Sequence, residues 1–130
     1  MFLDSSALVA ILLGEPDMSQ LRAKLKSSRR YTSPIVIYET TMAIMRDSRK
    51  SIAEAQSTVN DLLKAYRIVV LPIDDRHAAV ALEAFDRFGK GRHPAKLNMG
   101  DCFSYASARI QKAPLLFKGN DFSQTDIGVA

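Results

Sequence analysis

Four acidic residues stand where strand and helix ends are expected to gather, each beside apolar neighbours rather than within a charged run: Asp4, Glu39, Asp101 and Asp121. Carboxylates gathered at one place repel one another and take up protons unless a hard divalent cation neutralises them. Mg²⁺ or Mn²⁺ suits an all-oxygen site, whereas a single cysteine and two histidines offer no zinc motif. Such a cation could activate a water and neutralise the charge that builds up on a phosphodiester during hydrolysis.

The first of these acids lies in the opening stretch from Met1 to Leu13, which reads MFLDSSALVAILL. This order predicts a short buried strand that ends at Asp4 and passes through a serine N-cap into a buried helix. Asp4 would then lie at the carboxyl end of a strand, which is where open α/β sheets bind ligands. The alternative is that Asp4 only helps to cap the helix that follows it.

Glu39 is expected in the second turn of a helix. Ser33 as N-cap and Pro34 at the first helical position predict a helix that runs to about Asp47. Its buried stripe is expected to comprise Ile35, Tyr38, Met42 and Met45. Glu39 would lie beside this stripe, either as part of a site or as an ordinary surface acid.

Asp101 and Asp121 are expected near the starts and ends of later elements. Asn98–Gln111 is a predicted helix with Asp101 in its first turn, where the helix dipole keeps a carboxylate ionised. Asp121 follows the predicted short strand Leu115–Phe117. Asp101 could instead be only a capping acid, and Asp121 only a turn residue. Two neighbours remain alternatives for the role of Asp121, namely Asn120 and Asp126.

Helical and extended patterns alternate along the rest of the chain. Further helices are expected from Asp17, from the capping box at Ser51 and Glu54, and from Asp74 or Asp75 to Phe88; extended segments are expected at Tyr31–Thr32, Arg67–Leu71 and residues 122–130. The helix ending at Phe88 is expected to bury Ala78, Ala81, Leu82 and Phe85. This alternation predicts an α/β fold, with a mainly parallel sheet covered by helices on both faces.

Composition limits the class of protein and its compartment. The 130 residues, 47% of them apolar, are enough for one domain, residues 1–130, with a single core. No run of about eighteen uncharged apolar residues predicts a membrane span, and the start of the chain lacks the basic region of a secretory signal. One cysteine cannot form an internal disulfide, so the cytoplasm is the expected compartment.

The charged residues are unevenly spread. Eighteen basic residues against fourteen acidic ones give a net charge of +4, and the segments 22–30 and 87–96 are basic without containing an acid. Polyanions are therefore expected partners. The alternative is that these segments are a solvated helix face and a mobile loop.

Four segments together resemble a known family. They are FLDSSALVAIL at the start, the Tyr38-Glu39 pair, LNMGDCFSYASA from Leu97 to Ala108, and LLFKGNDFSQTDI from Leu115 to Ile127. In this order they resemble PIN-domain ribonucleases, and more narrowly the VapC-type toxins of bacterial toxin–antitoxin pairs. The resemblance covers essentially the whole chain.

The resemblance implies a PIN-like fold with a twisted, mainly parallel sheet of about four to five strands. It also implies an endoribonuclease that depends on Mg²⁺, or on Mn²⁺ in vitro, and that a VapB-type antitoxin inhibits. By their positions in the family's motifs, Asp4 and Asp101 would hold the metal, and Glu39 and Asp121 would complete the catalytic group. Ser5 matches the small hydroxyl residue that follows the first acid, although many relatives carry acids at both positions of the Asn120-Asp121 pair.

Other classes of protein fit less well. A phosphoacceptor receiver domain needs two adjacent acids after its first strand, and a haloacid-type phosphatase needs a second Asp two residues after Asp4, but Ser5 and Ser6 stand there. A nucleic-acid-binding module without catalysis leaves the acids unexplained, because carboxylates that face phosphates without a metal weaken binding. We therefore expect an RNA hydrolase that forms a homodimer and does not contact membranes. Its expected substrate-contacting residues are Ser5, Arg87, Arg92 and Lys96.

Overall fold

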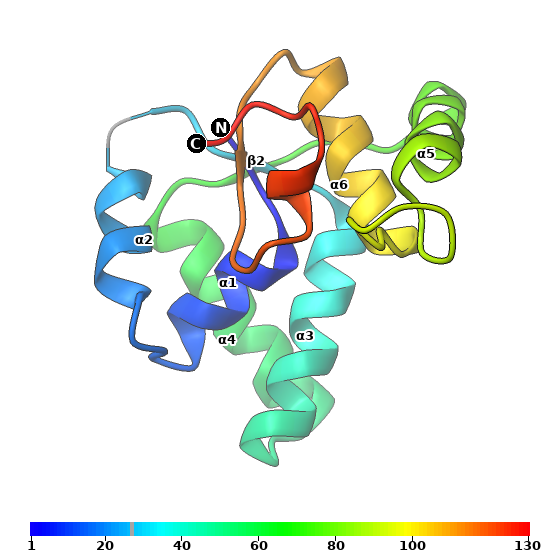
Figure 1. Ribbon diagram of the computed structural model, residues 1–130. Coiled ribbons are helices and arrows are strands. Elements are labelled where there is room, and N and C mark those ends of the chain that lie inside the picture. The colour runs from blue at the N-terminus through cyan, green and yellow to red at the C-terminus, as the bar shows by residue number, and fades with distance from the viewer. Residues whose placement is uncertain (27) are drawn as a thin grey trace.

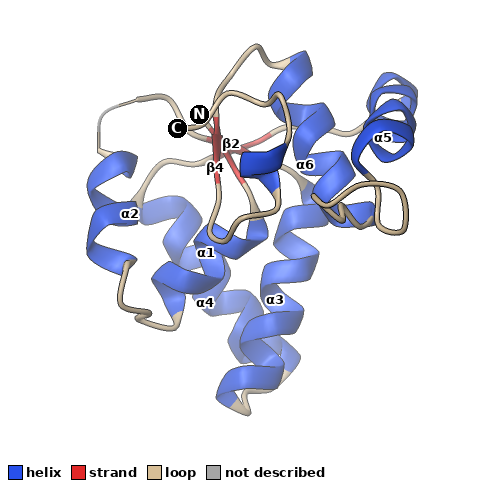
Figure 2. Cartoon of the chain, in the orientation of Figure 1, coloured by secondary structure: helices blue, strands red, loops and turns tan. Residues whose placement is uncertain are grey.

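The apolar start of the chain forms the middle of a parallel sheet. The computed structural model describes residues 1–26 and 28–130; residue 27, which belongs to the basic segment 22–30, lies outside the described residues. β1 (Phe2–Leu3) is fully buried and pairs in parallel with β2 (Tyr31–Thr32) and with β4 (Leu115–Leu116). β3 (Val69–Val70) pairs with β2, so the strand order is β3-β2-β1-β4. Figure 2 shows the short strands, in red, among the helices. The predicted parallel sheet is confirmed, with four strands in the described residues.

Helices surround this sheet and confirm the α/β class. The described residues form α1 (Ser5–Leu12), α2 (Met18–Leu25), α3 (Pro34–Ser48), α4 (Ile52–Ala65), α5 (Asp75–Phe88), α6 (Met99–Ile110) and a short 3₁₀ helix (Phe122–Gln124). α1 contacts α2 and α3, α3 packs on α4, and α6 packs on α5 and on β1 and β4. Figure 1 shows α1 to α4 as one group, with α6 and α5 beside it. Within the described residues, no helix is both long and apolar enough to cross a membrane.

Most helices begin where the sequence predicts. Ser33 caps α3 and Pro34 is its first residue, and both Ser51 and Asn98 form capping boxes, at α4 and α6. At the start of α1 the prediction is wrong, because the N-cap is Asp4 and not a serine. The strand ends one residue earlier than a serine cap requires, and aspartate caps a helix as well as serine does.

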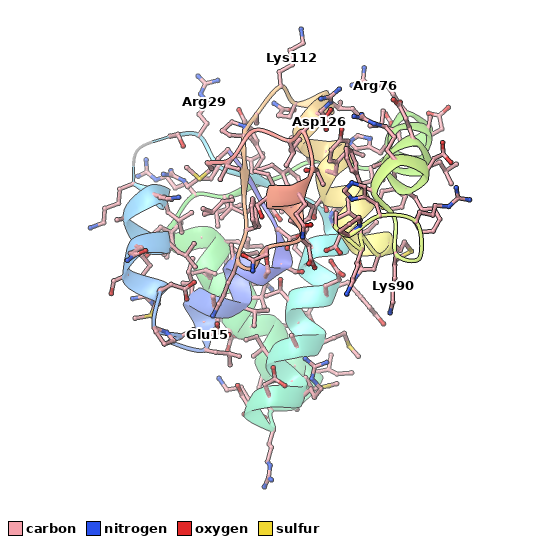
Figure 3. All side chains as sticks on the ribbon, in the orientation of Figure 1. Glu15, Arg29, Arg76, Lys90, Lys112 and Asp126 are labelled. Carbon is pink, nitrogen blue, oxygen red and sulfur yellow. The ribbon has the colours of Figure 1, made fainter. Side chains whose placement is uncertain are left out.

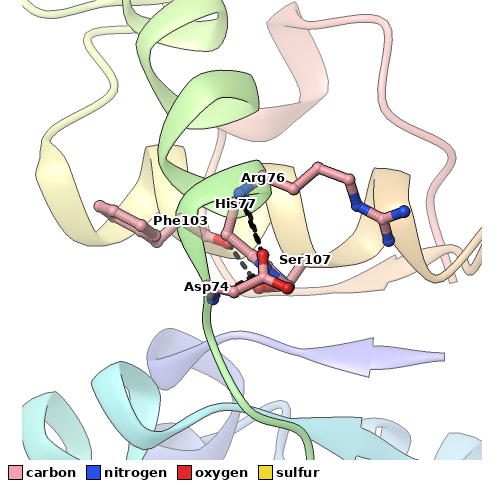
Figure 4. Close-up of polar contacts among 5 residues, drawn as sticks. All are labelled: Asp74, Arg76, His77, Phe103 and Ser107. Atoms are coloured by element: carbon pink, nitrogen blue, oxygen red, sulfur yellow. Dashed lines mark hydrogen bonds and ion pairs between the residues drawn. The ribbon is translucent and has the colours of Figure 1, made fainter.

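α5 begins at a second acid that serves as a cap. Asp74 Oδ1 accepts hydrogen bonds from the backbone N–H groups of Arg76 (3.0 Å) and His77 (3.3 Å), and lies 2.9 Å from His77 Nδ1 (Figure 4). The hydrogen bonds with His77 lower the pKa of Asp74. In the same view Ser107 donates to the carbonyl of Phe103 within α6 (2.8 Å). His77 is buried where α5 packs on α6, so its hydrogen bond with Asp74 links the cap of α5 to this contact.

The buried face of α3 differs from the predicted stripe. Its buried residues are Val36, Thr40, Thr41 and Ile44, whereas Tyr38 is 66% exposed and Met42 37% exposed. Thr41 can occupy the inner face because its hydroxyl bonds within the helix, donating to the carbonyl of Ile37 (2.7 Å). The hydroxyl of Thr40 is buried there without a hydrogen-bond partner among the described residues. The helix is therefore rotated relative to the prediction, and large apolar side chains remain at its surface.

The buried face of α5 also differs in part. His77, Ala81, Ala84 and Phe88 are buried, whereas Leu82 is 72% exposed and Phe85 38% exposed. Small alanines on the inner face let α5 approach α6 closely, so the larger residues lie outside the contact. The predicted edge strand in residues 122–130 is reduced to one parallel bridge between Leu115 and Val129.

Candidate active site

Asp4 lies at the carboxyl end of β1 and is only 2% exposed. Its Oδ2 accepts hydrogen bonds from the backbone N–H (3.0 Å) and the hydroxyl (2.6 Å) of Ser6. Its Oδ1 accepts a hydrogen bond from the hydroxyl of Ser104 (2.6 Å), which α6 supplies from 100 residues further along the chain. Neutral donors therefore hold the buried carboxylate, and neither serine was singled out by sequence because hydroxyls at these positions carry no distinctive pattern.

Asp101 is the third residue of α6 and belongs to its capping box. Its Oδ2 accepts the backbone N–H of Asn98 (3.0 Å), and its own N–H donates to Asn98 Oδ1 (2.9 Å). Burial raises the pKa of Asp101 to about 6; the hydrogen bond from Asn98 opposes this shift, while the charges of Asp4 and Asp121 add to it. Asp101 thus caps α6, which was the alternative interpretation from the sequence, and it also lies near the other acids.

Glu39 projects from the second turn of α3 toward the same acids. Burial, and after it the charges of Asp4 and Asp101, raise its pKa from 4.5 to about 7, while a hydrogen bond from Ser5 opposes the shift. Glu39 Oε1 is buried and has no hydrogen-bond partner among the described residues. A carboxylate with this surplus of negative neighbours is not an ordinary surface acid.

These three acids line one open hollow of about 410 Å³. Its walls come from the end of β1, the first turns of α1 and α6, the inner part of α3 and the turn after β4. The lining residues include Asp4, Ser5, Ser6, Glu15, Glu39, Arg46, Asn98, Asp101 and Lys118. Four separate parts of the sequence line the hollow, and three of them each supply one of the four predicted acids.

Asp121 lies outside the lining of this hollow and is exposed, but its charge acts on Asp101. Of its two rivals, Asn120 is exposed and its carbonyl accepts the hydroxyl of Ser123 (2.6 Å). Asp126 serves elsewhere, because it accepts the hydroxyl of Tyr105 (2.6 Å) and pairs with Arg87 (3.0 Å). Among these three residues, Asp121 is the acid whose charge reaches the hollow.

Comparison with known proteins places this arrangement in a family. The sequence matches the PIN domain over residues 1–128. This chain belongs to the PIN-domain family. It is 39% identical over 140 residues to a VapC ribonuclease of Rhizobium meliloti, an alignment that covers 98% of this chain and 99% of that one. It is 41% identical over 128 residues to ribonuclease VapC42 of Mycobacterium tuberculosis, covering 98% and 96%. The expected membership of the VapC group is therefore confirmed.

Solved structures agree with the PIN fold. The crystal structure of Mycobacterium tuberculosis VapC20, a toxin that cleaves the sarcin–ricin loop, superposes with a TM-score of 0.79 at 19% identity, covering 99% of this chain and 97% of that one. VapBC2 of Rickettsia felis, bound to a DNA fragment from its promoter, superposes with a TM-score of 0.74 at 16% identity, covering 98% and 94%. At these identities the likeness concerns the fold alone.

The basic residues of segment 87–96 separate into two groups. Lys90, Arg92, His93 and Lys96 line a shallow hollow of about 540 Å³ in the loop between α5 and α6. Arg92 pairs with Asp86 (3.0 Å) at the exposed surface. Arg87 does not line this hollow; it pairs with Asp126 and stacks on the ring of Phe88, 4.6 Å from its centre.

Lys118, in the turn after β4, lies at the rim of the acidic hollow. The ammonium group of Lys118 pairs with the carboxylate of Glu15 and lies 3.4 Å from Asp17 Oδ1. The backbone N–H of Lys118 donates to the hydroxyl of Ser6 (3.0 Å), which in turn donates to Asp4. This chain of bonds ties the turn after β4 to the first acid. Figure 3 shows Glu15 well apart from Asp126, so the two ion-pair clusters occupy different parts of the surface.

The donor set fits a hard divalent cation. Asp4, Glu39 and Asp101 supply only carboxylate oxygens, which Mg²⁺ and Mn²⁺ prefer. In the described residues, no three acidic, histidine or cysteine side chains already stand in metal-binding geometry. Negative charge in the hollow nevertheless exceeds what the available donors neutralise. The pKa values of Glu39 and Asp101 are raised, and Glu39 Oε1 has no hydrogen-bond partner among the described residues. A cation would relieve this excess.

Proposed function

We propose that this protein is a metal-dependent endoribonuclease and the toxin of a VapBC-type toxin–antitoxin pair. The observation that carries the proposal is the convergence of Asp4, Glu39 and Asp101 in one hollow, with two pKa values raised by burial and mutual repulsion. The net charge of +4 supports a polyanionic substrate. Relatives named VapC ribonuclease, about two-fifths identical over nearly the whole chain, support RNA as that substrate.

We assign the metal site to Asp4 and Asp101, with Glu39 and Asp121 completing the catalytic group, and we take Mg²⁺ as the physiological ion. When bound, such an ion activates water and stabilises the charge that develops on the phosphoryl oxygens. The serine hydroxyls of Ser6 and Ser104 fix the orientation of the Asp4 carboxylate, so it is preorganised before the ion arrives. Glu39 Oε1 is free to accept a hydrogen bond from the attacking water.

We place the RNA backbone across the loop between α5 and α6. Arg92 and Lys96 line a shallow basic hollow there, and the same loop leads through Asn98 into the first turn of α6, where Asp101 lies. Phosphates bound on this loop would therefore continue toward the acids. Ser5 lines the acidic hollow and could contact the reacting phosphate. Arg87 would join only if its pair with Asp126 opened.

The partners follow from the same site. A cognate VapB-type antitoxin would insert an arginine or lysine among the carboxylates, where it substitutes for the metal charge and blocks the substrate. Solved relatives of the fold include a toxin–antitoxin complex from Klebsiella pneumoniae and FitAcB from Neisseria gonorrhoeae. We further propose that the toxin is a homodimer and acts in the cytoplasm.

The direct test is cleavage of a mixed RNA substrate by the purified chain. We expect cleavage with Mg²⁺ or Mn²⁺, loss of cleavage after chelation, and recovery when the ion is restored. Activity that persists in the chelator, with contaminating nucleases excluded by the Asp4→Asn protein prepared in parallel, would contradict metal-dependent catalysis.

A further inference from the structure

Gly100 occupies an unusual place next to the acidic hollow. It is the second residue of α6, buried, with an ordinary helical backbone that any residue could adopt. Neither a turn nor a positive φ angle therefore requires glycine here. The space around its Cα atom, rather than its backbone conformation, must account for the missing side chain.

The carboxylate of Glu39 fills that space. A methyl group added at Gly100 would overlap Glu39 Oε2 and would lie 2.6 Å from its Cδ and 2.7 Å from its Oε1. All three nearest atoms belong to this one side chain. The carboxylate that α3 sends toward the acids thus rests directly on the backbone of α6, with Ser5 of α1 bonded to it.

This contact decides where the third carboxylate lies. α3 packs on both α1 and α6, and Glu39 reaches the hollow between their first turns. A side chain at position 100 would meet the far end of a flexible residue and not a backbone atom, so the helices could keep their places while Glu39 moved aside. The consequence would be a correctly folded protein with a displaced acid.

We propose that Gly100 is a positioning residue. Because it has no side chain, the Glu39 carboxylate can lie against α6 beside Asp4 and Asp101, in the place that metal binding and RNA cleavage require. The proposal rests on the metal-dependent nuclease activity proposed above. It assigns to Gly100 a role that acts through Glu39, because the three atoms nearest to a Cβ at this position all belong to that side chain.

The test is a mutant cycle of Gly100→Ala, Glu39→Ala and the double variant, with Gly128→Ala as the matched control. Gly128 also has no positive φ, and a methyl group there would lie 3.9 Å from the nearest backbone atom, which is ordinary contact. The measurements are RNA cleavage, the shift in melting temperature produced by Mn²⁺, and the melting temperature without metal. The last two do not depend on nuclease activity.

We expect Gly100→Ala to lower cleavage by about 100-fold, the scale expected when a catalytic group is misplaced. It should also reduce the Mn²⁺-induced shift while leaving the metal-free melting temperature level or higher, because alanine favours helix over glycine. In the Glu39→Ala background the same change should have no further effect on cleavage or on the Mn²⁺-induced shift, because the carboxylate that the methyl group would displace is then absent. Gly128→Ala should match the wild type.

Opposite outcomes overturn the proposal. If Gly100→Ala cleaves RNA and responds to Mn²⁺ as the wild type does, the position of Glu39 does not depend on Gly100. If Gly100→Ala causes equal losses with and without the Glu39 side chain, Gly100 acts through another group. If Gly100→Ala does not fold, folding of the double variant supports the contact and misfolding of the double overturns it. If the wild type cleaves no RNA, the nuclease proposal fails, yet the Mn²⁺ shifts of the cycle still decide the role of Gly100.

Discussion

Both carboxylate oxygens of Asp4 accept hydrogen bonds. One oxygen caps α1 and accepts the hydroxyl of Ser6, and the other accepts the hydroxyl of Ser104. A buried carboxylate costs several kcal/mol to desolvate unless donors meet it. The two readings of Asp4 from sequence, helix cap and site acid, are therefore not exclusive, because the same side chain caps the helix and lines the hollow.

Asp4→Asn should abolish cleavage and leave the fold intact. Asparagine caps a helix about as well as aspartate, and either serine hydroxyl can turn to suit the amide, but the negative charge that attracts a cation is gone. We expect cleavage to fall by about 100-fold or more. Melting without metal should stay level or rise, and the stabilisation by added Mn²⁺ should shrink.

Asp61→Asn, an exposed acid on α4, is the matched control and should behave as the wild type in both assays. Cleavage by Asp4→Asn at a near wild-type rate would show that Asp4 is only a cap. Loss of folding, detected by circular dichroism, would show instead that the charge itself holds α1 to β1.

The pH dependence of stability should carry the signature of Glu39. Its pKa of about 7 in the folded protein lies above the ordinary value of 4.5, so the folded state binds more protons than the unfolded state between these values. Without metal, stability should therefore be greatest near the lower value and fall as pH rises through about 7. Melting measured from pH 4.5 to 7.5 should show this decline, and Glu39→Gln should make it shallower, with Asp101, whose pKa is raised to about 6, supplying the remainder. A decline of equal slope in Glu39→Gln would assign it to other groups.

At the scale of elements, the loop between α5 and α6 connects the basic hollow to the acidic one. We expect Arg92→Ala combined with Lys96→Ala to weaken RNA binding equally across sequences, because phosphates carry no sequence information. The dependence of affinity on salt should become shallower by roughly one unit of slope per lost phosphate contact. Binding to an inactive Asp4→Asn protein at several salt concentrations measures both effects.

Lys64→Ala combined with Lys112→Ala removes the same charge from other parts of the surface and serves as the control. An unchanged salt slope in the loop variant would mean that the RNA lies elsewhere, with the basic residues of segment 22–30 as the next to test.

The C-terminal segment holds both Asp121, the acid assigned to the site from the sequence, and its alternative Asp126. Asp126 fastens this segment to α5 and α6 through Arg87, Tyr105 and Arg109, and the hydrogen bond with Tyr105 lowers its pKa. Asp126→Asn should therefore cost about 1 kcal/mol of stability and leave cleavage unchanged.

Asp121→Asn should have the opposite pattern of effects, with reduced cleavage and unchanged stability. Its side chain is exposed, and its charge acts on Asp101 at the hollow, so cleavage should fall by about tenfold while stability is retained. Measuring cleavage and chemical unfolding of both variants side by side tests the two assignments. An active Asp121→Asn together with an inactive Asp126→Asn would exchange the roles.

For the whole molecule, the proposed activity predicts harm to the cell that makes it. A basic protein with an acidic, cation-binding hollow would degrade RNA whenever its antitoxin is absent. Expression of the chain alone should slow growth, Asp4→Asn should not, and a cognate VapB-type protein should restore growth. Equal growth with and without the antitoxin, at matched protein levels, would count against the toxin assignment while leaving the nuclease assignment to the RNA assay.

Local patterns predicted the helices, the four strands of the sheet and most of the helix caps, whereas the strand expected in residues 122–130 is only one bridge. The apolar run at Phe2–Leu3, the cap at Ser33 and the box at Asn98 can be recognised from neighbours within a few residues. The parallel sheet followed from the alternation of strands and helices, which limits how such a chain can pack. The motifs around Asp4 and Asp101 similarly sufficed to indicate the family.

The tertiary structure alone decided which face each helix buries and which groups meet at the acids. The inward faces of α3 and α5 depend on how closely neighbouring helices approach, and threonine and alanine can serve there as well as larger apolar residues. Ser104 beside Asp4, Gly100 beneath Glu39 and Asp126 beside Tyr105 are contacts between segments far apart or on different helices. Local patterns cannot encode such contacts, because they arise only when the packed elements bring distant side chains within reach.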